Sequence, residues 1–304
     1  WRFRRILKGA NWAPLLQNPL EAPDVRIREG DCLLSVDGEP VSVKRDIQEY
    51  LVGKAGKTVT LVVNDRPDTA GARTVRLETL RDESAIRHFE WKEANYERVS
   101  ALSSGRIGYM HLSDMDEDGI GQFEQAFRAE RFREGLVVDV RDNTGGFVSW
   151  FLIDKLERKP VLFTRTRDFA PMQYPHGVHP GPLVFLCNEN TASDGELFIE
   201  HVKALGLGPV VGTPTWGGLL GFNNLIPTLD EGLVTQSNVG FTDRNGRWIV
   251  ENSGARPDVL VENRPEDVLS GRDRQLEKAV EICMRLLGGE RQQPLVPSAF
   301  PEKH

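Results

Sequence analysis

From about residue 105 onward, short apolar runs alternate with amphipathic stretches of helical length. The apolar runs occupy residues 107–112, 136–140, 183–187 and 210–211. The helices are predicted over residues 119–131, 147–157, 193–205 and 273–287. Strands that alternate with helices of this length are typical of an α/β layered fold. Each apolar run is much shorter than the ~20 residues of a membrane-spanning helix, so we expect no membrane span.

The first part of the chain has a different pattern, with short strands separated by turns. Strands are predicted over residues 3–7, 32–36, 59–63 and 75–77, and a short amphipathic helix over residues 44–51. We therefore expect a β-rich domain at 1–80, a charged connector with some helical character at 81–104, an α/β domain at 105–290 and a flexible tail at 291–304. The overall class is α/β (α+β).

Ser193 lies where an apolar strand passes through polar residues into a helix. The first N–H groups of a helix have no partners inside it and present a partial positive charge. A serine hydroxyl at this point has an oxyanion-binding amide beside it, that of Asp194. Ser193 and Glu196 also fit the S-x-x-E capping box, in which the two residues only satisfy each other's backbone donors. Taken alone, the capping box is the better interpretation.

A second donor is available in the loop that follows the strand at 136–140. Gly145 and Gly146 permit backbone angles closed to other residues, so an amide can face a ligand at close range. The amides of Gly146 and Asp194 are together the candidate oxyanion hole. The alternative is a tight strand-to-helix turn with no other role.

Composition excludes some functions. The net charge of -7 leaves no basic stripe, so we expect no nucleic-acid partner. His176 and His179 share a loop without a third ligand, so no metal site is expected. No other cofactor is expected either.

Cys32, Cys187 and Cys283 are odd in number and lie in apolar segments, which favours buried thiols and a cytoplasmic location. A periplasmic or secreted location is the alternative, because the N-terminus of the protein is not visible.

The first domain resembles a PDZ domain. The resemblance rests on three segments in order, at residues 30–41, 44–51 and 56–63. It implies that an extended peptide adds a strand to a sheet edge. The first strand of the family pattern is not found, so this domain is expected to be truncated at its N-terminus.

The rest of the chain resembles the C-terminal half of the tricorn-type serine peptidases of family S41. The matching motifs are Asp139-Val140-Arg141, Asn143, Gly145-Gly146, Ala192-Ser193-Asp194-Gly195, Trp216-Gly217-Gly218, Val250-Glu251-Asn252 and Pro257-Asp258-Val259. The resemblance implies a crotonase-like layered domain that hydrolyses oligopeptides through an acyl-enzyme on Ser193. Gly146 and Asp194 would be the oxyanion donors, and Glu251 would orient a second serine that holds the catalytic histidine. That histidine and the helper serine are expected upstream of Trp1.

The same resemblance implies further substrate contacts and partners. Gly145, Thr164 and Phe222 are assigned to substrate binding, and Thr164 stands where the family has an acidic residue that favours basic side chains. An apolar or mixed preference is therefore expected. The implied partners are peptides, further copies of the chain in a homo-oligomer, aminopeptidases and a proteasome-type protease upstream.

Three other functions remain open. A C-terminal processing peptidase uses a serine–lysine pair, but Gly218 stands where that lysine is expected. A crotonase-like acyl-CoA enzyme would use two backbone donors without an exposed serine. A PDZ-containing binding protein with an inactive hydrolase domain would need no base.

Overall fold

The computed structural model describes residues 1–10, 12–169, 171–222 and 224–288. The chain forms two compact units, Trp1–Ala94 and a second that begins at Asn95. The tail predicted at 291–304 lies outside the described residues.

The first unit is built on one four-stranded sheet in the order β2-β1-β3-β4. The strands are β1 (Cys32–Val36), β2 (Glu39–Pro40), β3 (Thr58–Asn64) and β4 (Arg73–Glu78). All neighbouring pairs are antiparallel. Val36, Val59 and Val63 are among the buried side chains of its core. The predicted strands at 32–36, 59–63 and 75–77 are confirmed.

Two other predictions for this unit were wrong in detail. The strand expected over residues 3–7 is absent from the described residues, where only an isolated bridge joins Arg2 to Cys32. The helix expected over residues 44–51 is a shorter 3-10 helix, η3 (Ile47–Leu51), capped by Asp46 through the Gln48 amide at 2.8 Å. Two more 3-10 turns, η1 (Pro14–Leu16) and η2 (Pro19–Glu21), precede the sheet.

The predicted connector is a continuous helix, α1 (Ser84–Ser103), of 20 residues. Ile86 near its start and Val99 near its end are both buried, and Val99 packs into a core cluster of the second unit. The connector is therefore more regular than its charged sequence predicts, because both of its ends bury apolar side chains.

The second unit contains a five-stranded parallel sheet in the order β13-β10-β9-β6-β5. The strands are β5 (Ile107–His111), β6 (Gly135–Asp139), β9 (Leu183–Cys187), β10 (Val210–Gly212) and β13 (Val259–Leu260). Every residue of β5, β6 and β9 is buried, as expected for a parallel sheet covered on both faces.

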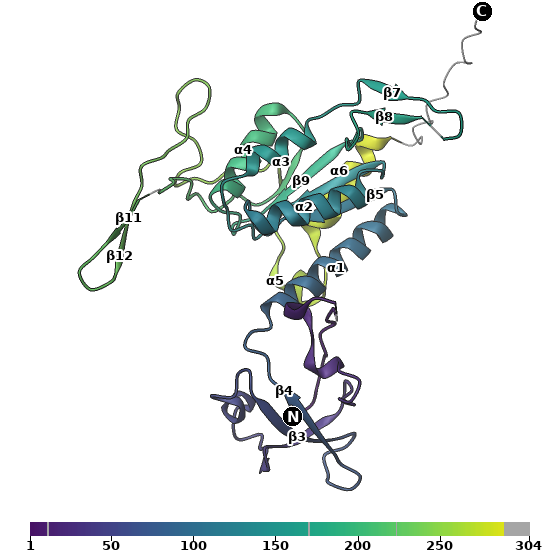
Figure 1. Ribbon diagram of the computed structural model, residues 1–304, viewed down its shortest axis with the longest axis vertical. Coiled ribbons are helices and arrows are strands. Elements are labelled where there is room, and N and C mark those ends of the chain that lie inside the picture. The colour runs from purple at the N-terminus through teal and green to yellow at the C-terminus, as the bar shows by residue number, and fades with distance from the viewer. Residues whose placement is uncertain (11, 170, 223, 289–304) are drawn as a thin grey trace, which may run out of the picture. The chain divides into compact units, whose positions relative to one another are not determined.

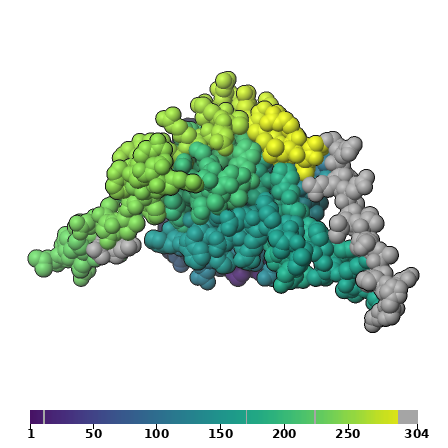
Figure 2. All heavy atoms as spheres, turned by 90° about the horizontal axis from the view of Figure 1, so that it is seen from above, coloured from purple at the N-terminus to yellow at the C-terminus, as the bar shows by residue number. Residues whose placement is uncertain are grey.

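Helices cover both faces of this sheet. Apolar side chains of α2 (Glu117–Glu130), α3 (Ser149–Leu156) and α4 (Asp194–Leu205) pack on one face. The other face is covered by α6 (Arg274–Leu287), which follows the short α5 (Pro265–Leu269). Figure 1 shows α2, α3 and α4 grouped beside β9, and Figure 2 shows α6 in yellow against green and teal segments of this unit. The predicted layered arrangement is confirmed.

Two antiparallel hairpins that the sequence pattern did not predict complete the unit. They are β7 (Leu162–Thr164) with β8 (Met172–Tyr174), and β11 (Asn224–Pro227) with β12 (Leu233–Gln236). All three cysteines are buried and free. Among the described residues, no helix is both long enough and apolar enough to cross a membrane.

Candidate active site

Two loops meet at the carboxyl ends of β6 and β9. Because these strands are parallel neighbours, residues 140–148 and residues 188–193 leave the sheet at the same edge. Asp142 and Asn188 join the loops twice: the Asp142 N–H donates to Asn188 Oδ1, and Asn188 Nδ2 donates to Asp142 Oδ1, each at 2.9 Å. The Thr191 hydroxyl donates to the Val140 carbonyl oxygen at 2.7 Å. The two predicted halves of the site are therefore held together.

Ser193 has an unusual backbone conformation, with φ 53° and ψ -121°. A residue with a side chain rarely adopts such angles, and holding it there costs about 1–3 kcal/mol. A strained turn between a strand and a helix is how α/β-hydrolases expose a nucleophilic serine. Ser193 is only partly buried. Its hydroxyl therefore stands at the start of α4 on a backbone that the surroundings must hold in place.

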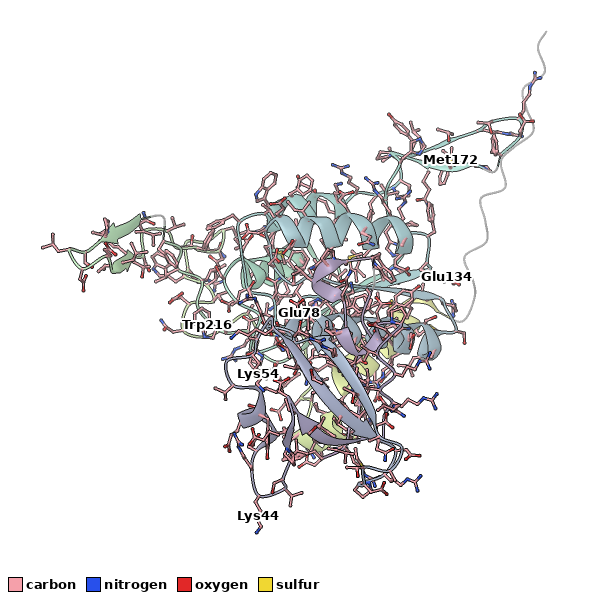
Figure 3. All side chains as sticks on the ribbon, turned by 60° about the horizontal axis from the view of Figure 1, so that its bottom comes forward. Lys44, Lys54, Glu78, Glu134, Met172 and Trp216 are labelled. Atoms are coloured by element: carbon pink, nitrogen blue, oxygen red, sulfur yellow. The ribbon has the colours of Figure 1, made fainter. Side chains whose placement is uncertain are left out.

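Glu196 is the residue that holds the Ser193 backbone. It is fully buried, and its carboxylate accepts the Ser193 N–H at 3.0 Å, so the glutamate side of the predicted capping box is present. The carboxylate also accepts the Thr215 hydroxyl and the amides of Gly217 and Gly218, at 2.6, 2.6 and 3.0 Å. A buried carboxylate needs such donors to offset the loss of hydration. Glu196 thus connects the serine to the turn that contains Trp216, which is labelled in Figure 3.

Of the two glycines, Gly145 lies directly against Ser193, whereas Gly146 lies against Met115. A methyl group placed on Gly145 would lie 2.6 Å from the Ser193 Cβ and 3.2 Å from its Oγ, and Gly145 has φ +88°. Gly146 has φ +149°, and a methyl group there would lie 2.1 Å from the Met115 carbonyl oxygen. Only glycine fits either position, for reasons of both space and backbone angle.

The amides of Gly146 and Asp194 are the donors that this arrangement leaves available. Among the described residues, neither N–H has a hydrogen-bond partner, whereas the Gly145 N–H donates to Asn143 Oδ1 at 2.9 Å. Gly146 is partly exposed, and Asp194 is the first residue of α4. One of these amides directly follows Ser193 and the other belongs to the loop that packs on it, and free amides so placed are candidates for stabilising a tetrahedral oxyanion.

The Asp194 side chain has a separate role. Its carboxylate accepts the N–H and the hydroxyl of Ser149, at 2.9 and 2.6 Å, and so caps the start of α3. Burial raises the pKa of the Asp194 carboxyl above its ordinary value, while the bonds from Ser149 oppose this shift. The two hydrogen bonds from Ser149 to Asp194 link the start of α3 to the start of α4, so the helices that follow the two loops are joined beside the candidate oxyanion hole.

Glu251 lies beside the same glycine-rich turn. Its Oε2 accepts the amides of Leu219 and Leu220 at 2.8 and 2.9 Å. Together, Glu196 and Glu251 bind four successive amides, those of residues 217–220. Glu251 Oε1 has no partner among the described residues, so it can accept a further donor such as a hydroxyl.

Other predicted residues are not joined to this group. The Thr164 hydroxyl bonds within its own hairpin, to the carbonyl oxygen of Met172, which is labelled in Figure 3. Phe222 is 52% exposed and adjoins Gly221, which forms a bridge with Val239. Within the described residues, no hydrogen bond connects Ser193 to a histidine; His111 bonds the Arg141 carbonyl oxygen and His179 that of Arg131.

Two residues of the site had no assigned function in the sequence analysis. Asn143 appeared only within a motif, and Glu196 only as a helix cap. An asparagine two residues before a glycine pair is a signal for a local side-chain turn. The four donors to Glu196 carry no local signal, because most come from residues about 20 positions away.

Comparisons with known proteins identify the family of the chain. Residues 106–261 match the model for peptidase family S41, and residues 1–82 match the model for the tricorn protease PDZ domain. The chain is 39% identical over 288 residues to "Tricorn protease homolog 1" of Streptomyces coelicolor, covering 94% of this chain and 27% of that protein. It is 36% identical over 258 residues to "Tricorn protease" of Thermoplasma acidophilum, covering 85% and 24%.

A solved structure is similar over most of the chain. The crystal structure of the tricorn protease matches with a TM-score of 0.80 and 34% identity, covering 91% of this chain and 27% of that one. The chain thus spans about a quarter of the length of these relatives. The match to the S41 model covers about half of the chain. The chain belongs to peptidase family S41.

Proposed function

We propose that the protein containing this chain is a tricorn-type serine peptidase that hydrolyses oligopeptides. The Ser193 Oγ attacks the scissile carbonyl carbon, and the amides of Gly146 and Asp194 hold the resulting oxyanion. The C–N bond then breaks to leave an acyl group on Ser193, which water removes. Glu251 orients a helper serine, and the proton acceptor is a histidine; both of these residues are contributed from outside the 304 residues.

The observation that carries this proposal is a pair of amides without a partner among the described residues: that of Asp194, directly after Ser193, and that of Gly146, next to the glycine that packs on Ser193. Neither a helix cap nor a simple tight turn requires a serine with strained backbone angles packed against a glycine. Each oxyanion donor contributes about 2.7–4 kcal/mol to transition-state stabilisation in enzymes of this type. The partly exposed Ser193 also argues against a purely structural cap.

Covalent labelling tests the nucleophile. A fluorophosphonate probe should phosphonylate Ser193 in the full-length protein, with loss of fluoride, because the site activates this hydroxyl and binds the phosphonyl oxygen. Mass spectrometry of the digested protein would locate the added mass. Heat-denatured protein is the control and should not react. Absence of label in active protein, or label on another residue, would refute the assignment.

Substrate preference is a second prediction. Thr164 supplies no charge, and the exposed side chains near the site include those of Phe147 and Trp216. We expect cleavage after apolar or mixed residues, measured as kcat/KM over a panel of fluorogenic peptides with the full-length protein. Gly145 and Phe222 are proposed to contact the same substrates. Dominant cleavage after Lys or Arg would contradict this preference.

The remaining elements of the proposal concern the cellular context. We propose a cytoplasmic homo-oligomer that receives oligopeptides from a proteasome-type protease and passes products to aminopeptidases.

We also propose that the two domains occupy residues 1–80 and 105–290. Gly218 donates its amide to Glu196, which is a structural use of the position where a serine–lysine peptidase would need its lysine.

A further inference from the structure

The residue that joins the two halves of the candidate oxyanion hole is Asn143. Its side chain is fully buried, and both of its polar atoms are used. The Oδ1 atom accepts the Gly145 N–H and the Nδ2 group donates to the Leu112 carbonyl oxygen, each at 2.9 Å. Leu112 directly follows β5, so this side chain fixes the glycine loop to the edge of the sheet.

The bond to Gly145 determines which amide of the loop is free. Because the Gly145 N–H is occupied by Asn143, the Gly146 N–H is the next donor along the chain. The peptide units around it are also held: the Gly145 carbonyl oxygen accepts the Met115 N–H at 2.7 Å, and the Phe147 N–H donates to the Met115 carbonyl oxygen at 2.8 Å. The Gly146 amide therefore has little freedom to rotate.

The other half of the hole is held by the same residue. The Asn143 carbonyl oxygen accepts the Ala192 N–H at 2.9 Å, one residue before Ser193. A methyl group placed on Gly195 would lie 2.7 Å from Asn143 Oδ1, so the asparagine side chain packs against the first turn of α4. Asn143 thus contacts the backbone on both sides of the Asp194 amide.

We propose that Asn143 is a positioning residue that sets the orientation of both oxyanion donors without itself touching the substrate. This inference rests on the proposed peptidase function. Positioned donors stabilise the transition state more than the bound substrate, so loss of their alignment should lower kcat with little change in KM. A residue needed only for folding would instead lower stability and leave the activity of the folded protein unchanged.

The test uses Asn143→Ala and Asn143→Asp in the full-length protein. Asn143→Ala should lower kcat by about 10²–10³-fold, the usual effect of losing one oxyanion donor. KM should change by less than about threefold, because ground-state binding does not use the oxyanion hole. The thermal midpoint of each variant is measured so that activity is expressed per folded molecule.

The pH dependence of the activity of the Asn143→Asp variant distinguishes a positioning role from a purely structural one. Burial raises the pKa of a carboxyl at this position, and the neutral acid can donate to Leu112 while accepting from Gly145, as the asparagine does. The charged form cannot donate and would repel the Leu112 carbonyl. The ratio of Asn143→Asp activity to wild-type activity should therefore rise as the pH falls, whereas the ratio for Asn143→Ala should stay flat.

Asn64 provides the matched control. It is also buried, accepts the Asp65 N–H at 3.0 Å and donates to the Asp68 carbonyl oxygen at 2.7 Å, but it lies in the first unit. Asn64→Ala and Asn64→Asp should leave kcat per folded molecule and its pH profile unchanged.

The possible failures are distinguishable. An inactive wild-type protein that fluorophosphonate does not label would refute the peptidase function. An active wild type with Asn143→Ala retaining at least half of its kcat, or Asn143→Asp with a ratio independent of pH, would refute the role of Asn143. If Asn143→Ala does not fold, the aspartate variant decides the question.

Discussion

Replacing Ser193 with alanine is expected to lower kcat/KM for peptide hydrolysis on the order of 10⁴-fold or more, because the acyl-enzyme cannot form without the hydroxyl. The fold should persist. The bonds that hold this position use the backbone N–H and carbonyl of residue 193, and alanine keeps both. The measurements are kcat/KM with a fluorogenic peptide and the thermal midpoint of the full-length protein.

Ser270→Ala is the matched control for this variant. The Ser270 hydroxyl donates to the Asp267 carbonyl oxygen at 2.8 Å, in the same unit but outside the site. Its removal should leave hydrolysis unchanged. Substantial activity in Ser193→Ala would mean that the nucleophile is another residue or a water molecule, and the acyl-enzyme mechanism would be wrong.

Replacing Arg141 with methionine is expected to produce the largest loss of stability. The guanidinium is buried and bonds Asp139 at 2.6 Å and Asp273 at 2.8 Å, which joins the end of β6 to the start of α6. Burial by itself would lower the pKa of Arg141. The carboxylates of Asp139 and Asp273 outweigh this effect and raise the pKa well above its ordinary value. Without it, the donors that remain for the buried Asp139 among the described residues are the Tyr109 hydroxyl and the amide of residue 141.

Breaking a buried ion pair by removing one partner costs about 3–5 kcal/mol. Urea unfolding of Arg141→Met should therefore show a reduction of this size in the free energy of unfolding. Arg106→Met removes a more exposed pair with Glu134 from the same unit and should cost much less. If Arg141→Met lowers the free energy of unfolding by no more than the small amount expected for Arg106→Met, the buried network contributes little to the stability of the unit.

The sequence predicted best the elements whose burial is nearly complete. The run that became β9 is apolar throughout, the run that became β6 is apolar except for Asp139, and the helix α4 begins one residue after the expected serine. The strand expected at residues 3–7 was wrong because arginines interrupt the apolar pattern, and pairing there is limited to Arg2. The hairpins β7–β8 and β11–β12 expose many of their apolar side chains, so no periodicity marked them.

The residues of the candidate site also differ in how well the sequence predicts them. The positions of Ser193, Gly146 and Asp194 follow from local features, namely a strand end, a glycine pair and a helix start. Glu251 could be assigned only through the family resemblance, because nothing local distinguishes it from a surface carboxylate. Asn143 and Glu196 could not be understood before the fold, since their importance lies in contacts with Leu112, Ala192 and residues 215–218.

The turn at residues 217–220 divides its successive amides between two glutamates, two for Glu196 and two for Glu251. An insertion or deletion inside this segment would transfer an amide from one carboxylate to the other and leave a donor without its acceptor. The length of the turn is therefore fixed by the spacing of the two glutamates. Variation in loop length during the evolution of this family would then be accommodated outside the segment, for example in the hairpin β11–β12 that follows it.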